Sequence, residues 1–213
     1  DSRGAAGTAN ICREPAMTTA QLEQAMAVGR DQVAEFKGAQ LFIGGDIGVG
    51  NSTIATTMSV AMTKLAATAM TGPSTGLDAM GVQKKTAVVT RALSRHLSKV
   101  KTGADILQYL GGFEVAALAG AYIAAAQQQT AVLVDGYICT AAAMAAVQIN
   151  PSIRPWLFFS HASSEPGHAR LLNKLDARPM LSLGLALGEG SGAALALPLM
   201  RSACALHREL PFK

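Results

Sequence analysis

Leu41-Phe42-Ile43-Gly44-Gly45-Asp46-Ile47-Gly48-Val49-Gly50-Asn51-Ser52-Thr53 runs from an apolar triplet into a glycine-rich loop. The triplet predicts a short buried strand, and the glycines predict tight turns after it. Residues 54–68 follow and are apolar enough for a core helix. A strand, a loop and a helix in this order form the first unit of a layered α/β fold.

The same order recurs twice further along the chain. Residues 131–134 predict a second strand, which ends in Asp135-Gly136 and leads into an alanine-rich helix over residues 140–147. Residues 156–159 predict a third strand before a polar loop, where Pro166 suits the first turn of a helix. Three such units predict an α/β fold with a mainly parallel, Rossmann-like sheet flanked by helices. Ligands of such sheets bind beyond the carboxyl ends of the strands.

Two further helices are predicted outside these units, and the first is amphipathic. A capping box at Thr18 and Gln21 predicts the start of a helix that ends at Gly38. Its expected buried face consists of apolar residues at helical spacing, namely Leu22, Met26, Val33 and Phe36. A more charged helix is expected over residues 82–99, after a polar break that contains Gly72-Pro73.

The C-terminal part is expected to consist mostly of helices, over residues 181–187 and 193–206, with a glycine loop between them. We therefore expect residues 1–175 to form the α/β core. In this interpretation, residues 176–213 form a smaller helical portion. The chain ends contribute to this helical portion. Such packing would bring Glu189 to an interior or interface position.

Composition restricts the class of protein. The chain has 213 residues, of which 50% are hydrophobic and 5% are aromatic, so it can bury a substantial core. Its net charge is +4, but the lysines and arginines are scattered, without the basic stripe and stacking aromatics of a nucleic-acid surface. We expect no nucleic-acid partner, and the mild positive excess suits small anions such as phosphorylated substrates.

Cysteine usage and hydropathy restrict it further. Cys12, Cys139 and Cys204 lie far apart without a CxxC pair, which favours neither a disulfide framework nor a zinc site. We expect a reducing, cytoplasmic location and no metal. Residues 115–134 carry no charge, but the polar residues 127–130 interrupt them, which indicates a buried helix and a strand rather than a membrane span. We expect no export signal, because the N-terminus has neither an initiating Met nor an apolar signal region, although it could equally be the interior of a longer chain.

Leu187-Gly188-Glu189-Gly190-Ser191-Gly192-Ala193-Ala194 holds one carboxylate among glycines and small residues, with apolar sequence on both sides. Partial desolvation raises the pKa of a carboxyl group toward the range where a general base works well. The glycines also let a ligand approach the backbone. Glu189 is therefore the first candidate for a catalytic residue. The alternative is an ordinary exposed turn.

Gly48-Val49-Gly50-Asn51-Ser52-Thr53 places backbone N–H groups at a predicted helix N-terminus, where they and the helix dipole favour a phosphate. No lysine follows the last glycine, so this is not a Walker A motif, and the spacing does not fit the GxGxxG dinucleotide pattern. The alternative is a turn capped by Asn51 or Ser52. Lys84 or Lys85 could reach a phosphate across the cleft, although helical lysines are most often solvated.

Three further polar residues could be functional or structural. His161, between a buried strand and a loop, could donate a hydrogen bond to a ligand, but its spacing from His168 is not that of a zinc-binding helix, and a structural role is favoured. Glu114 is expected to be a helix N-terminal acid with a structural role. Asp135, at a strand end, more often caps a turn than ligates a metal.

Four segments together, in their order and spacing, resemble the nicotinate-nucleotide:dimethylbenzimidazole phosphoribosyltransferase family. The similarity runs from about Gly7 to the C-terminus. The segments are Gly45-Asp46-Ile47-Gly48-Val49-Gly50-Asn51-Ser52-Thr53, Val134-Asp135-Gly136-Tyr137, Ser160-His161-Ala162-Ser163-Ser164-Glu165-Pro166-Gly167-His168 and Leu187-Gly188-Glu189-Gly190-Ser191-Gly192-Ala193-Ala194.

The resemblance implies a reaction between nicotinate mononucleotide and 5,6-dimethylbenzimidazole. The products are α-ribazole 5′-phosphate and nicotinate, in a step that assembles the lower ligand of cobalamin. Glu189 matches the catalytic base, which removes a proton from one benzimidazole nitrogen while the other attacks the anomeric carbon with inversion. A base that accepts one azole proton requires neither a metal nor a cofactor. The resemblance also implies a homodimer.

The resemblance further implies a set of substrate contacts. Lys85 matches the phosphate-binding lysine, Ser163 matches a serine on the phosphoribosyl side, and Leu187 falls on the wall of the base pocket. Asp46 stands where the family more usually has glutamate, which makes the contact of that second carboxylate an open point. The substrate-binding residues implied in this way are Asp46, Gly48, Asn51, Lys85, Ser163, Leu187 and Gly190.

The chain also departs from the family in length. Members carry a long N-terminal segment before the equivalent of Gly7, and this segment supplies further strands and part of the benzimidazole pocket. We therefore expect either a fragment or a natural short form. The second hypothesis is a binding-only protein that holds the nucleotide or phosphate without turnover. A third, a P-loop-like nucleotide enzyme, is disfavoured by the missing Walker lysine.

Overall fold

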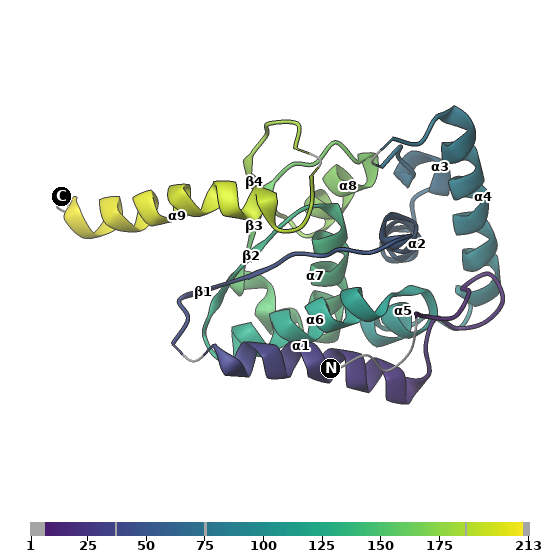
Figure 1. Cartoon of the computed structure of the whole chain (residues 1–213), viewed down its shortest axis with the longest axis horizontal. Coiled ribbons are helices and arrows are strands. Elements are labelled where there is room, and N and C mark those ends of the chain that lie inside the picture. The colour runs from purple at the N-terminus through teal and green to yellow at the C-terminus, as the bar shows by residue number, and fades with distance from the viewer. Residues whose placement is uncertain (1–6, 37, 75, 186, 211–213) are drawn as a thin grey trace.

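The computed structural model describes residues 7–36, 38–74, 76–185 and 187–210. A sheet of four parallel strands lies at the centre of this part of the chain, and neighbouring strands follow chain order (Figure 1). The parallel α/β architecture predicted from the sequence is confirmed. The strands are β1 (Leu41–Gly44), β2 (Ala131–Val134), β3 (Leu157–His161) and β4 (Pro179–Leu181).

Helices connect and cover these strands (Figure 1). A 3₁₀ helix, η1 (Pro151–Trp156), precedes β3. The α-helices are α1 (Thr19–Glu35), α2 (Asn51–Thr63), α3 (Ala67–Met70), α4 (Ala79–His96), α5 (Gly103–Leu110), α6 (Phe113–Gln127), α7 (Tyr137–Ile149), α8 (Pro166–Lys174) and α9 (Ser191–Glu209).

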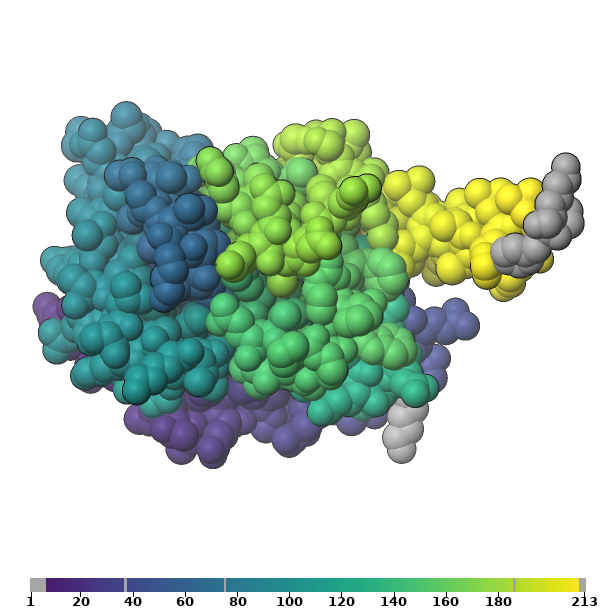
Figure 2. Space-filling view, turned by 180° about the vertical axis from the view of Figure 1, so that it is seen from behind, coloured from purple at the N-terminus to yellow at the C-terminus, as the bar shows by residue number. Residues whose placement is uncertain are grey.

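Side chains of the strands alternate between the two faces of the sheet. On one face, Val134 and Phe159 pack into the main core together with α6 and α7. On the other face, Leu133 is fully buried against Ala193 and Ala196 of α9. The first turns of α9 lie across the sheet, and the rest of the helix projects from the body (Figures 1 and 2). Strand β2 is therefore covered on both faces, as its continuous apolar sequence requires.

The first helix begins where the sequence predicts. Thr18 Oγ1 accepts the N–H of Gln21 at 3.2 Å, and Gln21 Oε1 accepts the N–H of Thr18 at 2.9 Å, which confirms the capping box. The helix ends at Glu35, however, and not at Gly38. Phe36, expected on the buried face, is its C-cap residue and is 61% exposed, because it lies beyond the last helical turn.

Helices α2 and α7 differ from their predicted bounds. Helix α2 ends at Thr63 and not at residue 68, because Lys64 adopts a left-handed conformation with φ of 63°. Helix α7 begins at Tyr137 and not at residue 140, so its N-terminus directly follows Gly136. Helix α4 lies close to its predicted position.

The C-terminal part differs most from the prediction. Pro179–Leu181 forms a fourth strand that pairs with β3, and a loop leads from it to α9. The expectation of mostly helical packing over residues 181–187 is wrong. In this segment of the sequence, leucines alternate with small residues. A period of two is typical of extended chain and not of a helix. These leucines are Leu181, Leu183, Leu185 and Leu187.

The third predicted strand is displaced along the chain. Trp156 ends η1, and Ser160 and His161, expected in the loop, belong to β3. The uncharged segment forms α6 and β2 with a polar turn between them, as predicted. Among the described residues, no helix has the length and hydropathy needed to span a bilayer.

Two glycines let α1 and α6 approach each other closely. A Cβ atom at Gly29 would collide with the carbonyl oxygen of Ala117, and one at Gly120 would collide with the carbonyl oxygen of Met26. The obstacles are backbone atoms, which cannot rotate away. The contact between these helices therefore requires residues without a side chain.

Gly29→Ala is expected to lower the free energy of unfolding by about 1–3 kcal/mol, because the new methyl group must push α1 away from α6. Thermal unfolding followed by circular dichroism measures the loss. Gln24→Ala, on the exposed side of the same helix, is the control and should change stability by less than about 0.5 kcal/mol. An unchanged Tm for Gly29→Ala would contradict the close helix contact.

Candidate active site

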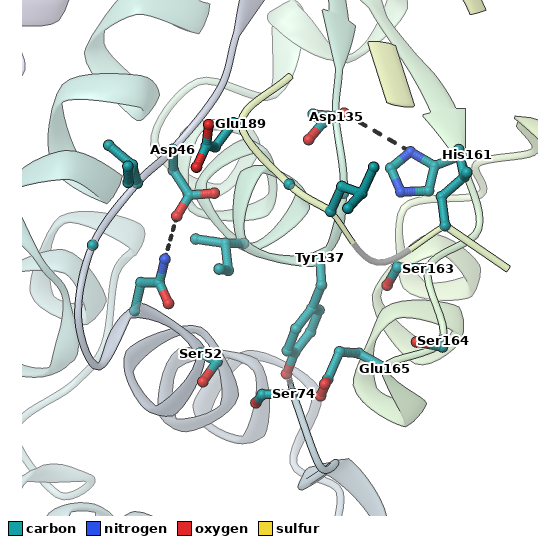
Figure 3. A pocket seen from close by; sticks show the side chains of 18 residues that line it. Asp46, Ser52, Ser74, Asp135, Tyr137, His161, Ser163, Ser164, Glu165 and Glu189 are labelled. Atoms are coloured by element: carbon teal, nitrogen blue, oxygen red, sulfur yellow. Dashed lines mark hydrogen bonds and ion pairs between the residues drawn. The ribbon is translucent and has the colours of Figure 1, made fainter. Parts of the chain in front are cut away.

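A pocket of about 260 Å³ opens at the carboxyl edge of the sheet (Figure 3). Parallel strands direct the loops that follow them to one edge, and three such loops meet here with the loop before α9. The volume is close to the lower limit of small-molecule sites, roughly 300 Å³. The lining residues are 46–48, 51, 52, 74, 135–138, 161, 163–165, 185 and 187–189.

Asp46 and Asn51 form the first side of the pocket. The Asn51 amide Nδ2 donates a 2.6 Å hydrogen bond to Asp46 Oδ2. Helix α2 has Gly50 as its N-cap residue, with φ of 87° and no side-chain hydrogen bond. The alternative of a turn capped by Asn51 or Ser52 is therefore not what the structure shows. The backbone N–H groups at this helix end carry no side-chain cap.

Asp46 lies at an acidic end of the pocket. Burial raises the pKa of Asp46, and the negative charges of Asp135 and Glu189 raise it further, while the Asn51 hydrogen bond opposes this. The Asp46 and Glu189 side chains point toward one another in Figure 3. Glu114 in the first turn of α6 has its pKa raised by burial, and the charge of Asp46 contributes. The acidic end of the pocket therefore favours a ligand group that donates a hydrogen bond over a ligand group that carries a negative charge.

Glu189 lies in a turn of unusual backbone conformation. Gly188, Glu189 and Gly190 all have positive φ, of 74°, 57° and 81°. Glycines adopt this conformation readily, but a glutamate does so at a cost. The turn packs on Gly45, where a Cβ atom would lie 2.6 Å from the Glu189 carbonyl carbon. Glu189 is exposed in this chain, so of the expected interior or interface position the interior is wrong, and an interface position stays a prediction.

Asp135 connects the loop after β2 to the start of α9. Its side chain is 1% exposed. Oδ1 accepts the N–H of Ala193 at 2.9 Å, and Oδ2 accepts the N–H of Gly190 at 3.2 Å. Asp135 is therefore a cap, as its position at a strand end indicates, but it caps a helix more than fifty residues further along the chain.

His161 packs between two glycines beside Asp135. A Cβ atom on Gly192 would collide with its ring, and one on Gly136 would touch it at 3.4 Å. The Ser160 hydroxyl donates to the Asp135 carbonyl oxygen at 3.1 Å, so His161 Nδ1 donates to Ser160 Oγ at 2.9 Å. Burial lowers the pKa of His161, although Asp135 opposes the shift. The structural role that the sequence favours agrees with these contacts.

His168 fixes the backbone of the loop after β3. Its Nδ1 accepts the N–H of Ser163 at 2.9 Å, so Nε2 carries the hydrogen and donates to Thr140 Oγ1 at 3.0 Å. Thr140 in turn donates to the carbonyl oxygen of Gly136 at 2.8 Å. This chain of bonds joins two of the pocket loops and sets the position of Ser163.

Lys85 lies behind the opposite end of the pocket. It is 5% exposed, and Nζ donates to Ser74 Oγ at 2.7 Å and to the carbonyl oxygen of Gly72 at 3.3 Å. Burial lowers the pKa of Lys85, and the nearby Glu165 opposes this. Glu165 Oε2 is buried and has no hydrogen-bond partner among the described residues. Lys84 is exposed, as the sequence predicts for most helical lysines.

The pocket brings together most of the predicted site residues. Two of them do not line it: Lys85 lies behind Ser74, and the N–H of Gly190 is already bound to Asp135. Those that line the pocket are Asp46, Gly48, Asn51, Ser163, Leu187 and Glu189. Whether each contacts a substrate stays a prediction.

Sequence reasoning missed several residues that line the pocket. Tyr137 forms the floor, and burial raises its pKa to about 12. Its place after a strand end was the available signal. Ser74 and Glu165 lie in a polar break and a polar loop, where composition does not separate lining residues from solvated ones. Within the described ranges, no group of three His, Cys, Asp or Glu residues could hold a metal ion.

Fold and site together define a class of protein: a parallel α/β protein with a pocket at the carboxyl edge of its sheet, acidic at one end and with a buried lysine behind the other. The phosphoribosyltransferase family model matches residues 1–212. The chain belongs to the nicotinate-nucleotide:dimethylbenzimidazole phosphoribosyltransferase family.

Individual relatives carry that name. A nicotinate-nucleotide–dimethylbenzimidazole phosphoribosyltransferase of Pseudomonas putida strain W619 is 53% identical over 206 residues, which are 96% of this chain and 59% of the relative. The enzyme of that name from Pseudomonas aeruginosa strain UCBPP-PA14 is 54% identical over 207 residues, with the same coverage. The crystal structure of the Thermus thermophilus enzyme gives a TM-score of 0.86 at 38% identity, over 92% of this chain and 58% of that one.

The buried His168 is expected to make stability depend on pH. Burial lowers the pKa of His168 to about 3, with His161 contributing, whereas an unfolded histidine titrates near 6.5. Below that pH the unfolded chain binds a proton that the folded protein does not bind until about pH 3. The contribution of His168 to the free energy of unfolding is therefore complete above pH 6.5. It decreases as the pH is lowered, by about 2 kcal/mol at pH 5.

Chemical denaturation at pH 7.5 and pH 5 measures this loss. His168→Gln is expected to lose about 2 kcal/mol less than the parent protein between the two values, because glutamine does not titrate. An equal loss in both proteins would show that His168 is not the group responsible.

Proposed function

We propose that this protein transfers the phosphoribosyl group of nicotinate mononucleotide to 5,6-dimethylbenzimidazole or a related azole, giving α-ribazole 5′-phosphate and nicotinate. The observation that carries the proposal is the meeting of the Glu189 loop with the loops after β1 and β3 at one pocket. The names of the relatives specify the same two substrates. The chain spans 59% of the length of the first of these relatives.

Glu189 acts as the base in the proposed reaction. Its carboxylate takes the N–H proton of the azole, and the lone pair of the other azole nitrogen attacks C1′ of the ribose from the opposite side. The bond from C1′ to the pyridine nitrogen breaks, and its electron pair returns to that nitrogen and neutralises the pyridinium. The exposed position of Glu189 at the pocket leaves it accessible to a substrate. The charge of Asp46 beside it favours an approaching N–H donor.

The phosphate is proposed to lie toward Lys85. Here the phosphate replaces Ser74 as the partner of the buried ammonium group, and Ser74 already lines the pocket. The uncapped N-terminus of α2 also lines the pocket, through Asn51 and Ser52, and supplies N–H groups and a favourable dipole. Gly190 then contributes close backbone approach and not a hydrogen bond, because Asp135 already holds its N–H.

The azole is proposed to contact the apolar mouth of the pocket. Ile47 is 78% exposed and Leu187 is 80% exposed, although both line the pocket. Residues 1–175 bind the phosphoribosyl group in this proposal, and residues 176–213 carry the base. Asp46 has a shorter side chain than the usual glutamate and is bound to Asn51, so it shapes the acidic end and does not accept the azole proton.

Glu189→Gln is expected to keep binding of nicotinate mononucleotide within about twofold while lowering product formation by at least about 100-fold, because the amide cannot accept the proton. Calorimetry measures binding, and mass spectrometry of α-ribazole 5′-phosphate measures turnover. Glu23→Gln, exposed on α1, is the control with the same chemical change and should leave both unchanged. Unchanged product formation in Glu189→Gln would refute the assigned role.

The same measurements distinguish an enzyme from a binding-only protein. Binding of both substrates together with product formation supports the transferase. Binding of the nucleotide without binding of the azole and without product would favour the binding-only alternative.

We further propose a homodimer. Leucines are exposed along one side of α9 at a spacing that keeps them in a single stripe, namely Leu195, Leu199 and Leu206. Beyond its first turns the helix projects from the body (Figure 2), and these leucines are 49–57% exposed. A second copy would bury the stripe.

The free cysteines of the structure accord with a proposed cytoplasmic location.

Light scattering after size exclusion is expected to give twice the mass of 21.9 kDa for the parent protein. The pair Leu199→Glu and Leu206→Glu should give the monomer mass, because two charges cannot be buried unpaired in an apolar interface. Arg201→Glu with Arg208→Glu, on the opposite side of α9, is the matched control and should stay dimeric. A parent protein that is monomeric at all concentrations would exclude the homodimer.

A further inference from the structure

We propose that Asp135 is a positioning residue that holds the Glu189 turn in its working conformation. The inference rests on the proposed function, because that function makes Glu189 the base. Three observations support it: the hydrogen bonds of Asp135, the strain of the turn, and the way the Asp135 charge is compensated.

The hydrogen bonds tie Asp135 directly to the backbone that carries Glu189. Its two carboxylate oxygens accept the N–H of Gly190 at 3.2 Å and the N–H of Ala193 at 2.9 Å. Gly190 is the residue that follows Glu189, and Ala193 lies in the first turn of α9. Both oxygens are therefore engaged by the backbone, and Asp135 acts on the turn and not on the substrate.

The turn needs such a contact to keep its shape. Glu189 has φ of 57° between two glycines of positive φ, and a non-glycine residue stays in this region only where its surroundings fix it. Gly45 supports the turn by close packing on the Glu189 carbonyl group. Asp135 supplies the directed contacts, through hydrogen bonds that resist both rotation and displacement.

The Asp135 charge is compensated by the turn itself. The two N–H groups and the N-terminal end of the α9 dipole favour a carboxylate. His161 Nδ1 lies 3.9 Å from Asp135 Oδ1, but burial lowers the pKa of His161 and keeps its ring neutral near pH 7. The anion and the turn therefore depend on one another. Removing the charge should loosen the Glu189 turn in particular.

A double-mutant cycle tests this dependence in the 213-residue protein. Asp135→Asn is expected to lower kcat by about 10–100-fold with KM for nicotinate mononucleotide within about twofold, because the base is displaced while the nucleotide site is intact. In the Glu189→Gln background the same change should alter the residual kcat by less than about twofold, because the base is already gone. Equal losses in both backgrounds would show a general structural role and overturn the inference.

Asp105→Asn is the control. Asp105 Oδ2 also accepts backbone N–H groups at a helix start, from Lys101 at 3.0 Å and Thr102 at 2.8 Å, but it belongs to α5 and does not line the pocket. Its kcat should equal that of the parent. If the parent protein forms no α-ribazole 5′-phosphate, the proposed function fails. If Glu189→Gln keeps full activity, the assignment of Glu189 as the base fails; if only Asp135→Asn keeps full activity, the positioning role alone fails.

Amide hydrogen exchange gives a result that does not depend on turnover. In Asp135→Asn the N–H groups of Gly190 and Ala193 should exchange at least about tenfold faster, because each loses a charged acceptor. Asp105→Asn should leave these two amides unchanged. Unchanged exchange in Asp135→Asn would overturn the inference even if the 213-residue protein showed no activity.

Discussion

Parallel pairing of β1, β2 and β3 is the constraint on which the site depends. The register aligns the three strands so that they end at one edge, where Gly44 lies beside Val134 and Val134 beside Phe159. The register of the strands therefore brings loops from distant parts of the sequence together, and no direct contact between the loops is needed for this. The fourth loop joins them because Leu133 must be covered on its second face, and the first turns of α9 cover it. Burial of one leucine thus helps to fix the position of Glu189.

Much of this arrangement follows from local sequence. Apolar runs with glycine or polar ends predict three of the strands and the edge at which ligands bind, and the Thr18 capping box predicts the first helix start. Strand β4 is not predicted, because its three residues are too short for a periodic signal and include a proline. The burial of Lys85 cannot be predicted from the sequence either, because a lysine in a helix does not indicate which loop will cover it. Tertiary packing decides both.

Contacts between distant segments explain why the sequence predicts Asp135 as a cap but does not predict its partner. A carboxylate at a strand end satisfies nearby N–H groups in most proteins, and the rule holds here. Which N–H groups are nearest depends on the return of the chain through β4 to the sheet edge. Small residues make that return possible, because Gly192 leaves room for the His161 ring and Gly45 for the Glu189 carbonyl group. Gly192 and Gly45 therefore mark close approach between segments of the chain.

The two facing carboxylates illustrate how environment divides their roles. Asp46 is half-buried, bound to the Asn51 amide and has a raised pKa, so it takes part in the internal bonding of the pocket. Glu189 is exposed on a turn held from below by Asp135. An exposed carboxylate is well hydrated, and in the proposed reaction an apolar azole that binds against Leu187 and Ile47 would remove that water on arrival. The desolvation of Glu189 that the sequence predicts for the folded chain would then occur in the proposed complex with the azole.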